Sequence, residues 1–172
     1  MISDSEGLMF PILKNDGLCS WVQNDTEVLA PSGRNPVAGN LFEDGGSIFH
    51  GNDSAALAQH VKTVGASYSD GTDYRIPLEK NDGSFTYLQS GTETTATGVP
   101  SGSKPECSSY FHTTDNRLVD GASGTELAKE VEKVGRSAYN GSVERTPLTI
   151  TSRTCLPIRH GHSPRRRDPD AA

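Results

Sequence analysis

The stretch of sequence that decides the fold occurs twice in this chain. Residues 47–78 read SIFHGNDSAALAQHVKTVGASYSDGTDYRIPL, and residues 117–148 read RLVDGASGTELAKEVEKVGRSAYNGSVERTPL. The two stretches align with one constant offset and no gaps, and roughly a third of the aligned positions are identical. A repeat with a period of about 70 residues indicates tandem structural units rather than one continuous domain.

A second repeat overlaps the first and sets the unit boundaries. The sequence PILKNDG at residues 11–17 returns as PLEKNDG at residues 77–83. We therefore divide the chain into a first unit at 1–76, a second unit at 77–146, and a truncated third start at 147–172. The third part includes a basic C-terminal tail, which we predict to be extended or disordered. Tandem units of this size favour a structural or display protein over an enzyme.

The composition limits how stable one unit can be. Hydrophobic residues make up 33% of the 172 residues and aromatic residues 6%. Such a unit has a thin core and gains stability from contacts between subunits. We expect Trp21, Phe42 and Phe49 to lie in the core or in an interface. The net charge of −6 is unevenly distributed, because arginines make the tail basic and leave the body acidic, which does not favour nucleic-acid binding.

The cysteines and the apolar runs exclude other classes of protein. Cys19, Cys107 and Cys155 are widely spaced and odd in number, so they form no disulfide framework or zinc motif. We interpret them as small buried apolar residues, and Cys19 and Cys155 both align with Phe85 in the repeat. No signal region and no run long enough to span a membrane is present, which predicts assembly in a cytoplasm.

Turn residues and apolar spacing predict the secondary structure of each unit. Asp-Gly pairs within 14–17 and 80–83 predict tight hairpins, and the alternation after Gly83 predicts a half-buried strand. Short strands flank the turns at 43–46 and 114–116. Residues 31–39 and 89–105 are rich in Gly, Pro, Ser and Thr, and we expect surface loops there.

One segment of each unit has the spacing of a helix. Leu57, Val61 and Val64 in the first copy correspond to Leu127, Val131 and Val134 in the second. This spacing predicts a helix with one narrow apolar stripe, ending at Gly65 or Gly135. Asp70-Gly71 and Asn140-Gly141 then turn the chain into another strand. The predicted fold class is α+β, with short antiparallel strands and hairpins plus one helix in each of two tandem units.

The order of these features resembles the tail collar domain family of bacteriophages. That family reads approximately as C-D-G, a short helix, I-G-x-x-Y-G-x-G-D-G, an aromatic-containing strand and P-D-L. The matching residues of the first copy are Asp44-Gly45, Val64-Gly65, Tyr68, Asp70-Gly71, Tyr74 and Pro77-Leu78. The resemblance implies a virion protein, such as a tail fibre or collar component, assembled as a homotrimer in the cytoplasm of the host.

The resemblance also implies a metal site near the C-terminus. Collar proteins often end in L-P-x-H-x-H, and this chain has Leu156-Pro157 followed by His160-Gly161-His162. Alternate residues of an extended strand face the same side, so His160 and His162 of three chains offer six nitrogen donors. An octahedral set of imidazoles suits a transition metal ion on the threefold axis. The rival interpretation is a solvated tail.

The expected function is non-catalytic. The sequence has no nucleophile elbow, no phosphate-binding loop and no carboxylate pair repeated in both units. We expect a structural protein of a tailed phage or phage-like particle that contacts other virion proteins and a glycan or receptor on the host surface. The exposed segments at 24–39 and 90–106 are the candidate contact regions. The alternatives are a capsid decoration protein and a small carbohydrate-binding module.

Overall fold

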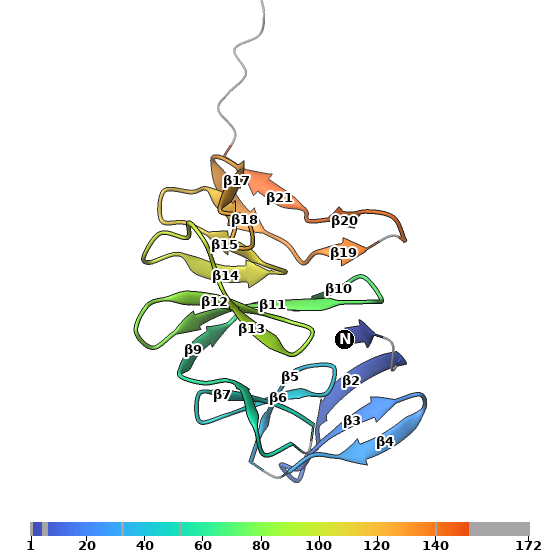
Figure 1. Cartoon of the computed structure of the whole chain (residues 1–172). Helices are drawn as coiled ribbons and strands as arrows, with labels where there is room; N and C mark the ends of the chain where they lie inside the picture. Colours follow the sequence, from blue (N-terminus) through green and yellow to red (C-terminus); the bar gives the residue numbers. More distant parts are fainter. Residues whose placement is uncertain (1, 5–6, 32, 52, 140, 152–172) are drawn as a thin grey trace, which may run out of the picture.

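The molecule is built from strands alone over the part of the chain that the structure describes. The structure, a computed structural model, describes residues 2–4, 7–31, 33–51, 53–139 and 141–151. These residues form strands β1 to β21 and contain no helix, so the predicted α+β class is wrong and the fold is all-β. Figure 1 shows the strands arranged in layers that follow one another from the first sheet to the last.

One antiparallel meander occurs twice along the chain. Sheet A has the order β1 (Ile2–Asp4), β2 (Gly7–Leu13), β3 (Cys19–Gln23) and β4 (Thr26–Leu29). Sheet C has the order β10 (Tyr68–Ser69), β11 (Tyr74–Lys80), β12 (Phe85–Gln89) and β13 (Thr92–Thr95), and β9 (Val61–Val64) also pairs with β11. Leu13 opposes Cys19 in sheet A, as Glu79 opposes Phe85 in sheet C. Equivalent residues therefore pair in the same way within the two sheets.

A second meander follows the first in both units. Sheet B has the order β5 (Asn35–Ala38), β6 (Leu41–Asp44), β7 (Ser47–His50) and β8 (Ala56–Ala58). Sheet D has the order β14 (Lys104–Cys107), β15 (Tyr110–His112), β16 (Leu118–Asp120) and β17 (Thr125–Ala128). The segments expected to be loops at 31–39 and 89–105 thus contain β5, β13 and the start of β14.

The last layer repeats the beginning of sheet C. In it, β18 (Val131–Val134) pairs with β21 (Leu148–Ile150), and β19 (Ala138–Tyr139) pairs with β20 (Glu144–Arg145). Val134 opposes Leu148 as Val64 opposes Leu78. The predicted unit boundary at 76 and 77 falls within β11, and the boundary at 146 and 147 falls between β20 and β21.

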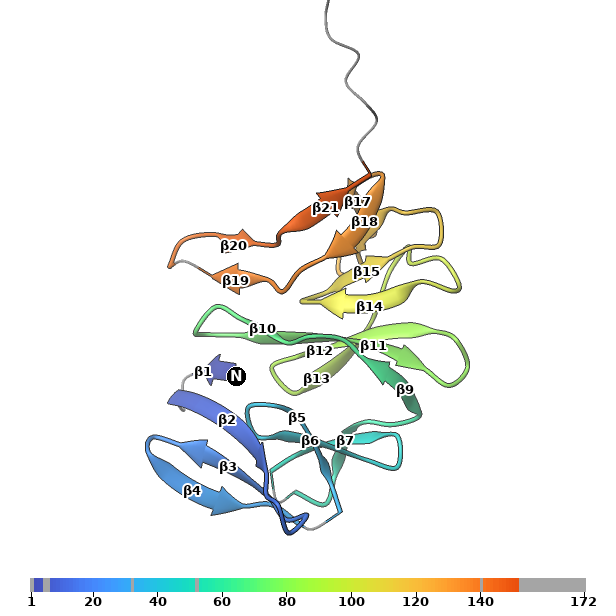
Figure 2. The same ribbon diagram turned by 180° about the vertical axis from the view of Figure 1, so that it is seen from behind.

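The core lies between the layers rather than inside each sheet. The view from behind shows the same order of layers, with β2 to β4 at one end, β10 to β13 in the middle and β19 to β21 at the other end (Figure 2). Trp21 and Phe42 are buried with ring centroids 6.1 Å apart, and both belong to the main core cluster. Phe49 is half-buried beneath the guanidinium of Arg34, which lies 4.2 Å from the ring centroid.

The two predicted helices are β-strands joined by sharp turns. Leu57 lies in β8, which pairs with β7, whereas Val61 and Val64 lie in β9, which pairs with β11. His60 between them has a φ of 58°, and the equivalent Glu130 has a φ of 57°. A left-handed residue redirects the chain, so each segment leaves one sheet and enters the next.

A β-bulge explains why these strands have helical spacing. The register of β9 on β11 shifts between Glu79 and Lys80, so that Val61 opposes Lys80 and Thr63 opposes Glu79. The extra residue breaks the two-residue period of the strand. Val61 is buried and Val64 half-buried, with Lys62 and Thr63 exposed between them. Turn and bulge together produce the spacing of four and three residues that a helix would give.

The predicted Asp-Gly turns are confirmed. Gly17 and Gly83 have φ values of 82° and 81° in the loops before β3 and β12, and Gly71 and Gly141 both have a φ of 92°. The amide of Lys80 donates to Ser84 O at 2.9 Å, as Lys14 N donates to Leu18 O at 2.8 Å. Glycine tolerates this backbone conformation without steric cost, so sequence alone identifies these turns.

One ion pair repeats with the fold. Lys14 Nζ lies 2.5 Å from Glu27 Oε1, and Lys80 Nζ lies 2.6 Å from Glu93 Oε1 at the equivalent place of the second unit. Thr86 Oγ1 also donates to Glu93 at 2.8 Å. The repeat therefore includes side-chain pairs as well as turns and apolar positions.

The turn at Asp70 makes part of the stability dependent on pH. Asp70 Oδ1 accepts the amides of Asp73 and Thr72, both at 2.8 Å, and these bonds lower the pKa of the carboxyl. We expect Asp70→Ala to reduce the free energy of unfolding by about 1 kcal/mol at pH 7. Because the folded-state pKa is the lower one, this contribution is complete above the unfolded pKa of about 4 and is lost as the pH falls further.

Urea unfolding of both proteins at neutral and acid pH tests this expectation. The difference between wild type and Asp70→Ala should shrink as the pH is lowered towards about 2. A difference that stays constant over this range would show that the ionised carboxylate does not hold the turn.

Candidate interaction surfaces

The predicted metal ligands are not among the residues that the structure describes. His160 and His162, like Cys155, lie beyond Thr151, so the geometry of the predicted site is outside the described part. Within the described ranges, no group of three His, Cys, Asp or Glu residues is placed to hold a metal ion. The metal site stays a prediction from the sequence.

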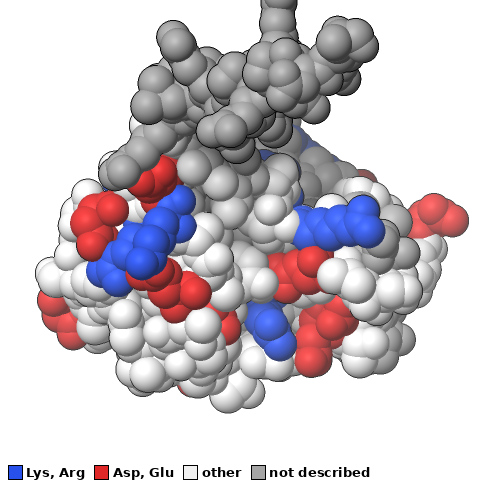
Figure 3. Space-filling model, turned by 90° about the horizontal axis from the view of Figure 1, so that it is seen from above, with Lys and Arg blue, Asp and Glu red and all other residues white. Residues whose placement is uncertain are grey.

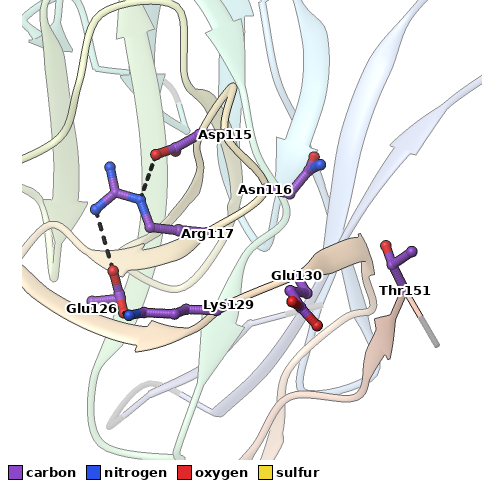
Figure 4. A pocket seen from close by; sticks show the side chains of 7 residues that line it. All are labelled: Asp115, Asn116, Arg117, Glu126, Lys129, Glu130 and Thr151. Atoms are coloured by element: carbon purple, nitrogen blue, oxygen red, sulfur yellow. Dashed lines mark hydrogen bonds and ion pairs between the residues drawn. The ribbon is translucent and has the colours of Figure 1, made fainter. Parts of the chain in front are cut away.

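A charged depression lies where sheet D meets the last layer. Its volume is about 580 Å³, and Figure 4 shows its lining side chains, which come from the β15–β16 turn, from β17, and from the residues next to β18 and β21. The lining residues are Asp115, Asn116, Arg117, Glu126, Lys129, Glu130 and Thr151.

The charges of this depression are already paired. Arg117 Nε donates to Asp115 Oδ2 at 2.8 Å, and Arg117 Nη1 donates to Glu126 Oε2 at 3.2 Å. Lys129 Nζ lies 3.3 Å from Glu126 Oε1. Hydrogen bonds from Thr113 and then from Arg117 lower the pKa of the Asp115 carboxyl. Three carboxylates surround two cations, so the surface suits a polar partner with hydrogen-bond donors better than an anion.

Comparing the two copies would have found this surface in the sequence. Arg117, Glu126 and Lys129 occupy the places that Ser47, Ala56 and Gln59 hold in the first copy. The charged set is therefore specific to the second unit. Most residues that the two copies share belong to the turns and the core. Residues that differ between the copies form the surface that is available to a partner.

The view from above shows no segregated basic face. Described Lys and Arg side chains lie beside Asp and Glu in the same regions of the surface (Figure 3). A surface of mixed sign does not provide the continuous positive field that a phosphate backbone requires.

A groove runs beside β5 and β9. Two adjoining hollows of about 400 Å³ and 320 Å³ share Val37, Val64 and Gly65 in their walls. Lys62 and Glu43 line the first hollow, and Arg136 lines the second. This groove includes part of the 24–39 segment that we singled out as a contact region.

The two described cysteine thiols contribute packing rather than chemistry. Cys19 and Cys107 are buried and free, which confirms the interpretation of these two residues. Burial raises the pKa of the Cys107 thiol, and its Sγ lies 3.2 Å from Ser137 Oγ. A thiol whose pKa is raised is mostly protonated at neutral pH, and the thiolate is the nucleophilic form.

The half-buried histidines hold neighbouring strands. His112 Nε2 lies 2.9 Å from Val131 O, and its Nδ1 lies 3.6 Å from Glu106. His50 Nε2 lies 2.8 Å from Asn40 Nδ2, and its Nδ1 lies 3.5 Å from Asp53. These contacts connect β15 with β18 and β7 with the residue before β6, so they explain both rings as structural groups.

Comparison of the chain with family models, with curated proteins and with solved structures finds no match. Among the described residues, no helix has the length and apolar character that a membrane span requires.

Proposed function

We propose that this chain is a non-catalytic structural protein of a tailed phage or phage-like particle. It acts as a tail fibre, collar or adaptor component, assembles as a homotrimer, contacts other virion proteins and contributes to attachment at the host surface. The observation that carries the proposal is a stack of repeated β-layers whose first layer, among the described residues, leaves the apolar side chains of Phe10 and Leu29 exposed on a face that also carries Glu27.

The outward face of sheet A corresponds to a face of sheet C whose apolar side chains are buried. Ile76 and Leu88 of sheet C are 0% exposed, because the sheet B layer of the first unit covers them. Their equivalents in sheet A are Phe10, which is 40% exposed, and Val22, which is half-buried. Leu29 on β4 is 59% exposed.

An apolar face of this kind is stabilised when another subunit or another virion protein covers it. Exposed apolar clusters rimmed by polar residues commonly mark protein interfaces. Burial would remove this surface from water at about 25 cal/mol per Å² of apolar area. The thin core predicted from the composition makes such contacts important for stability.

The resemblance to the tail collar family rests on turns and strands, not on a helix. The Asp-Gly turn at Asp70 and the strand through Pro77-Leu78 are present, whereas the segment aligned with the family's helix is β8 and β9. The proposal therefore relies on the repeated layers first and on the resemblance second.

Light scattering after size exclusion tests the assembly. We expect a mass three times the 18.4 kDa of one chain. Phe10→Asp should reduce the mass to that of one chain without changing the unfolding midpoint of the monomer, because a buried charge opposes docking of the apolar face. Val143→Asp is the matched control, since Val143 is 54% exposed at the other end of the stack.

The same measurement with a strong chelator tests the predicted metal. Loss of the trimer on chelation would support His160 and His162 as ligands on the threefold axis. A trimer that withstands the chelator would contradict the metal site and leave the assembly intact. A folded monomer at all concentrations would contradict the homotrimer.

Of the described aromatic side chains only Phe10 and Tyr139 are exposed, each at 40%, and this shortage of exposed rings disfavours the carbohydrate-binding module. Trp21, Tyr74 and Tyr87 are each 6% exposed, so their ring faces are not available to stack on a sugar. A capsid decoration protein would assemble in the same way but would not bind host cells, and binding of the labelled protein to whole cells separates these two roles.

A further inference from the structure

The last layer has an open strand edge. In sheet C, β11 is paired on both edges, with β9 and β10 on one side and β12 on the other. In the last layer, β18 and β19 take the places of β9 and β10. Over the described residues, nothing occupies the place of β12 beside β20 and β21.

Backbone groups of β21 point to this edge. The amide of Lys80 donates to Ser84 O across the β11–β12 turn, and hydrogen-bonded pairs alternate along an antiparallel ladder. The amide of Leu78 therefore faces β12, and Leu148, at the equivalent position, directs its amide to the open edge. An unpaired strand edge of this kind accepts another strand.

Apolar side chains of the last layer and of the neighbouring β17 are also less covered than their equivalents. Leu78 is 0% exposed, whereas Leu148 is half-buried. Leu57 is half-buried and lies on β8, against which β13 packs, whereas Leu127 is 48% exposed. In the middle layer, β12 and β13 lie on this side of the apolar side chains. Among the described residues, no strand takes their place in the last layer.

The sequence after Thr151 keeps the apolar pattern of the strand that would fit. Position by position, residues 155–159 (CLPIR) align with CSWVQ of β3 and FTYLQ of β12. The two buried positions of β12, Phe85 and Leu88, become Cys155 and Ile158, and Cys155 repeats the buried Cys19. Residues 155–159 lie outside the described part, so their sequence is the evidence.

The proline in this segment is compatible with the register. Pro157 aligns with Tyr87, which opposes Pro77 in a pair that lies between hydrogen-bonded pairs. At such a position the strand needs no amide towards its neighbour, so proline is tolerated there.

We propose that residues 155–159 of this chain bind along the open edge of β20 and β21 as an additional antiparallel strand, with Cys155 opposite Thr149 and Arg159 opposite Arg145. The added strand covers the apolar side chains of the last layer. The docking is intramolecular, and it is independent of the proposed role in a virion.

A disulfide trap in the full-length protein tests the register. Thr149→Cys places a thiol opposite Cys155, at the position where Glu79 opposes Phe85. Side chains of a non-hydrogen-bonded pair lie close enough for a disulfide. Arg145→Cys is the matched control, because it lies on the same edge, is also exposed, and is four positions away. Both variants are equilibrated in a glutathione redox buffer, and disulfide-linked peptides are identified after digestion.

We expect Thr149→Cys to form an intramolecular disulfide with Cys155 at an effective concentration about tenfold or more above that of Arg145→Cys. A free tail would favour neither position strongly, because the closure of loops of six and ten residues differs little in entropy. Equal trapping at both positions would therefore overturn the proposal. Disulfide-linked dimers of Thr149→Cys would also overturn it, since a second copy would then supply the strand.

Hydrogen exchange on the same full chain provides a second measurement. The amide of Leu148 should exchange slowly in the wild type and at least about tenfold faster in Leu156→Pro, which removes the opposing amide and distorts the added strand. Leu156→Ala should retain the protection. Fast exchange of Leu148 in the wild type would contradict the added strand even where the cysteine variants fail to fold.

Discussion

Phe111→Ala is expected to lower the free energy of unfolding by about 3–5 kcal/mol, the range for removing a buried aromatic ring. Phe111 is 0% exposed, and its ring lies edge-on to Phe85 with centroids 5.3 Å apart. Gly121 lies directly against the ring, since a Cβ there would be 2.6 Å from Phe111 Cε2. The truncation would therefore leave a cavity between sheets C and D that the backbone cannot fill without moving.

Urea unfolding followed by tryptophan fluorescence and by circular dichroism measures this loss. Tyr139→Ala is the control, because Tyr139 is 40% exposed in β19 and should cost less than about 1 kcal/mol. A similar small cost for Phe111→Ala would show that sheets C and D do not share a packed core. A loss confined to the circular dichroism signal would show that the two units unfold separately, since Trp21 lies in the first unit.

Gly65→Ala is expected to destabilise the protein by about 3 kcal/mol, at the upper end of the usual cost of overpacking. A Cβ on Gly65 would lie 2.6 Å from Pro77 Cγ, 2.9 Å from Glu106 O and 3.0 Å from the carbonyl carbon of Pro105. The amide of Ala66 donates to Glu106 O at 2.6 Å, so this is where the β9–β10 connection meets β14. The ring of Pro77 and the backbone of Pro105 and Glu106 are stiff, so moving them away from the added Cβ costs free energy.

The repeat supplies a control for this effect. A Cβ on Gly135 would lie 2.5 Å from Pro147 Cγ and 3.3 Å from Pro147 O, in the last layer. Pro147 is exposed, whereas Pro77 is buried, so the last layer can adjust more easily. We expect Gly135→Ala to cost less than Gly65→Ala in thermal unfolding, and the reverse order would contradict the close packing of the middle layers.

The turns and the repeat were predictable because their causes are local. The turns at Asp16-Gly17, Asp82-Gly83 and Asp70-Gly71 require a positive φ at glycine. Glycine adopts this conformation without steric cost, so an Asp-Gly pair in the sequence indicates a turn. The alternation from Phe85 to Leu88 likewise reflects the two faces of one strand. The strand predicted after Asn140-Gly141 followed from alignment with the first copy, and the structure has the short strands β20 and β21 in this region.

The helices were predicted wrongly because the deciding interactions are not local. Leu57, Val61 and Val64 have the spacing of a helix, but β8 and β9 belong to different sheets and exchange hydrogen bonds with β7 and β11. No property of residues 57–64 alone reveals that Glu79, far along the chain, opposes Thr63 across a bulge. The same error occurs in both copies because the repeat preserves the bulge together with the sequence pattern.

The charged depression and the groove beside β5 also could not be predicted from residues that are close in sequence. Arg117, Asp115 and Glu126 come together because the β15–β16 turn lies beside β17, and the groove beside β5 requires β9 to lie next to it. The sequence could show only that the second copy carries charges where the first does not.

The amino-acid sequence by itself determined the repeat, the positions of the tight turns and which residues are apolar, since each depends on a residue and its near neighbours. Only the tertiary structure decided that the described residues are all-β, that layers share a core, and that no described strand covers one face of sheet A or pairs with one edge of β21. Sheet pairing joins residues distant in sequence, and its hydrogen bonds and interlayer contacts override the local spacing that a helix and a bulged strand have in common.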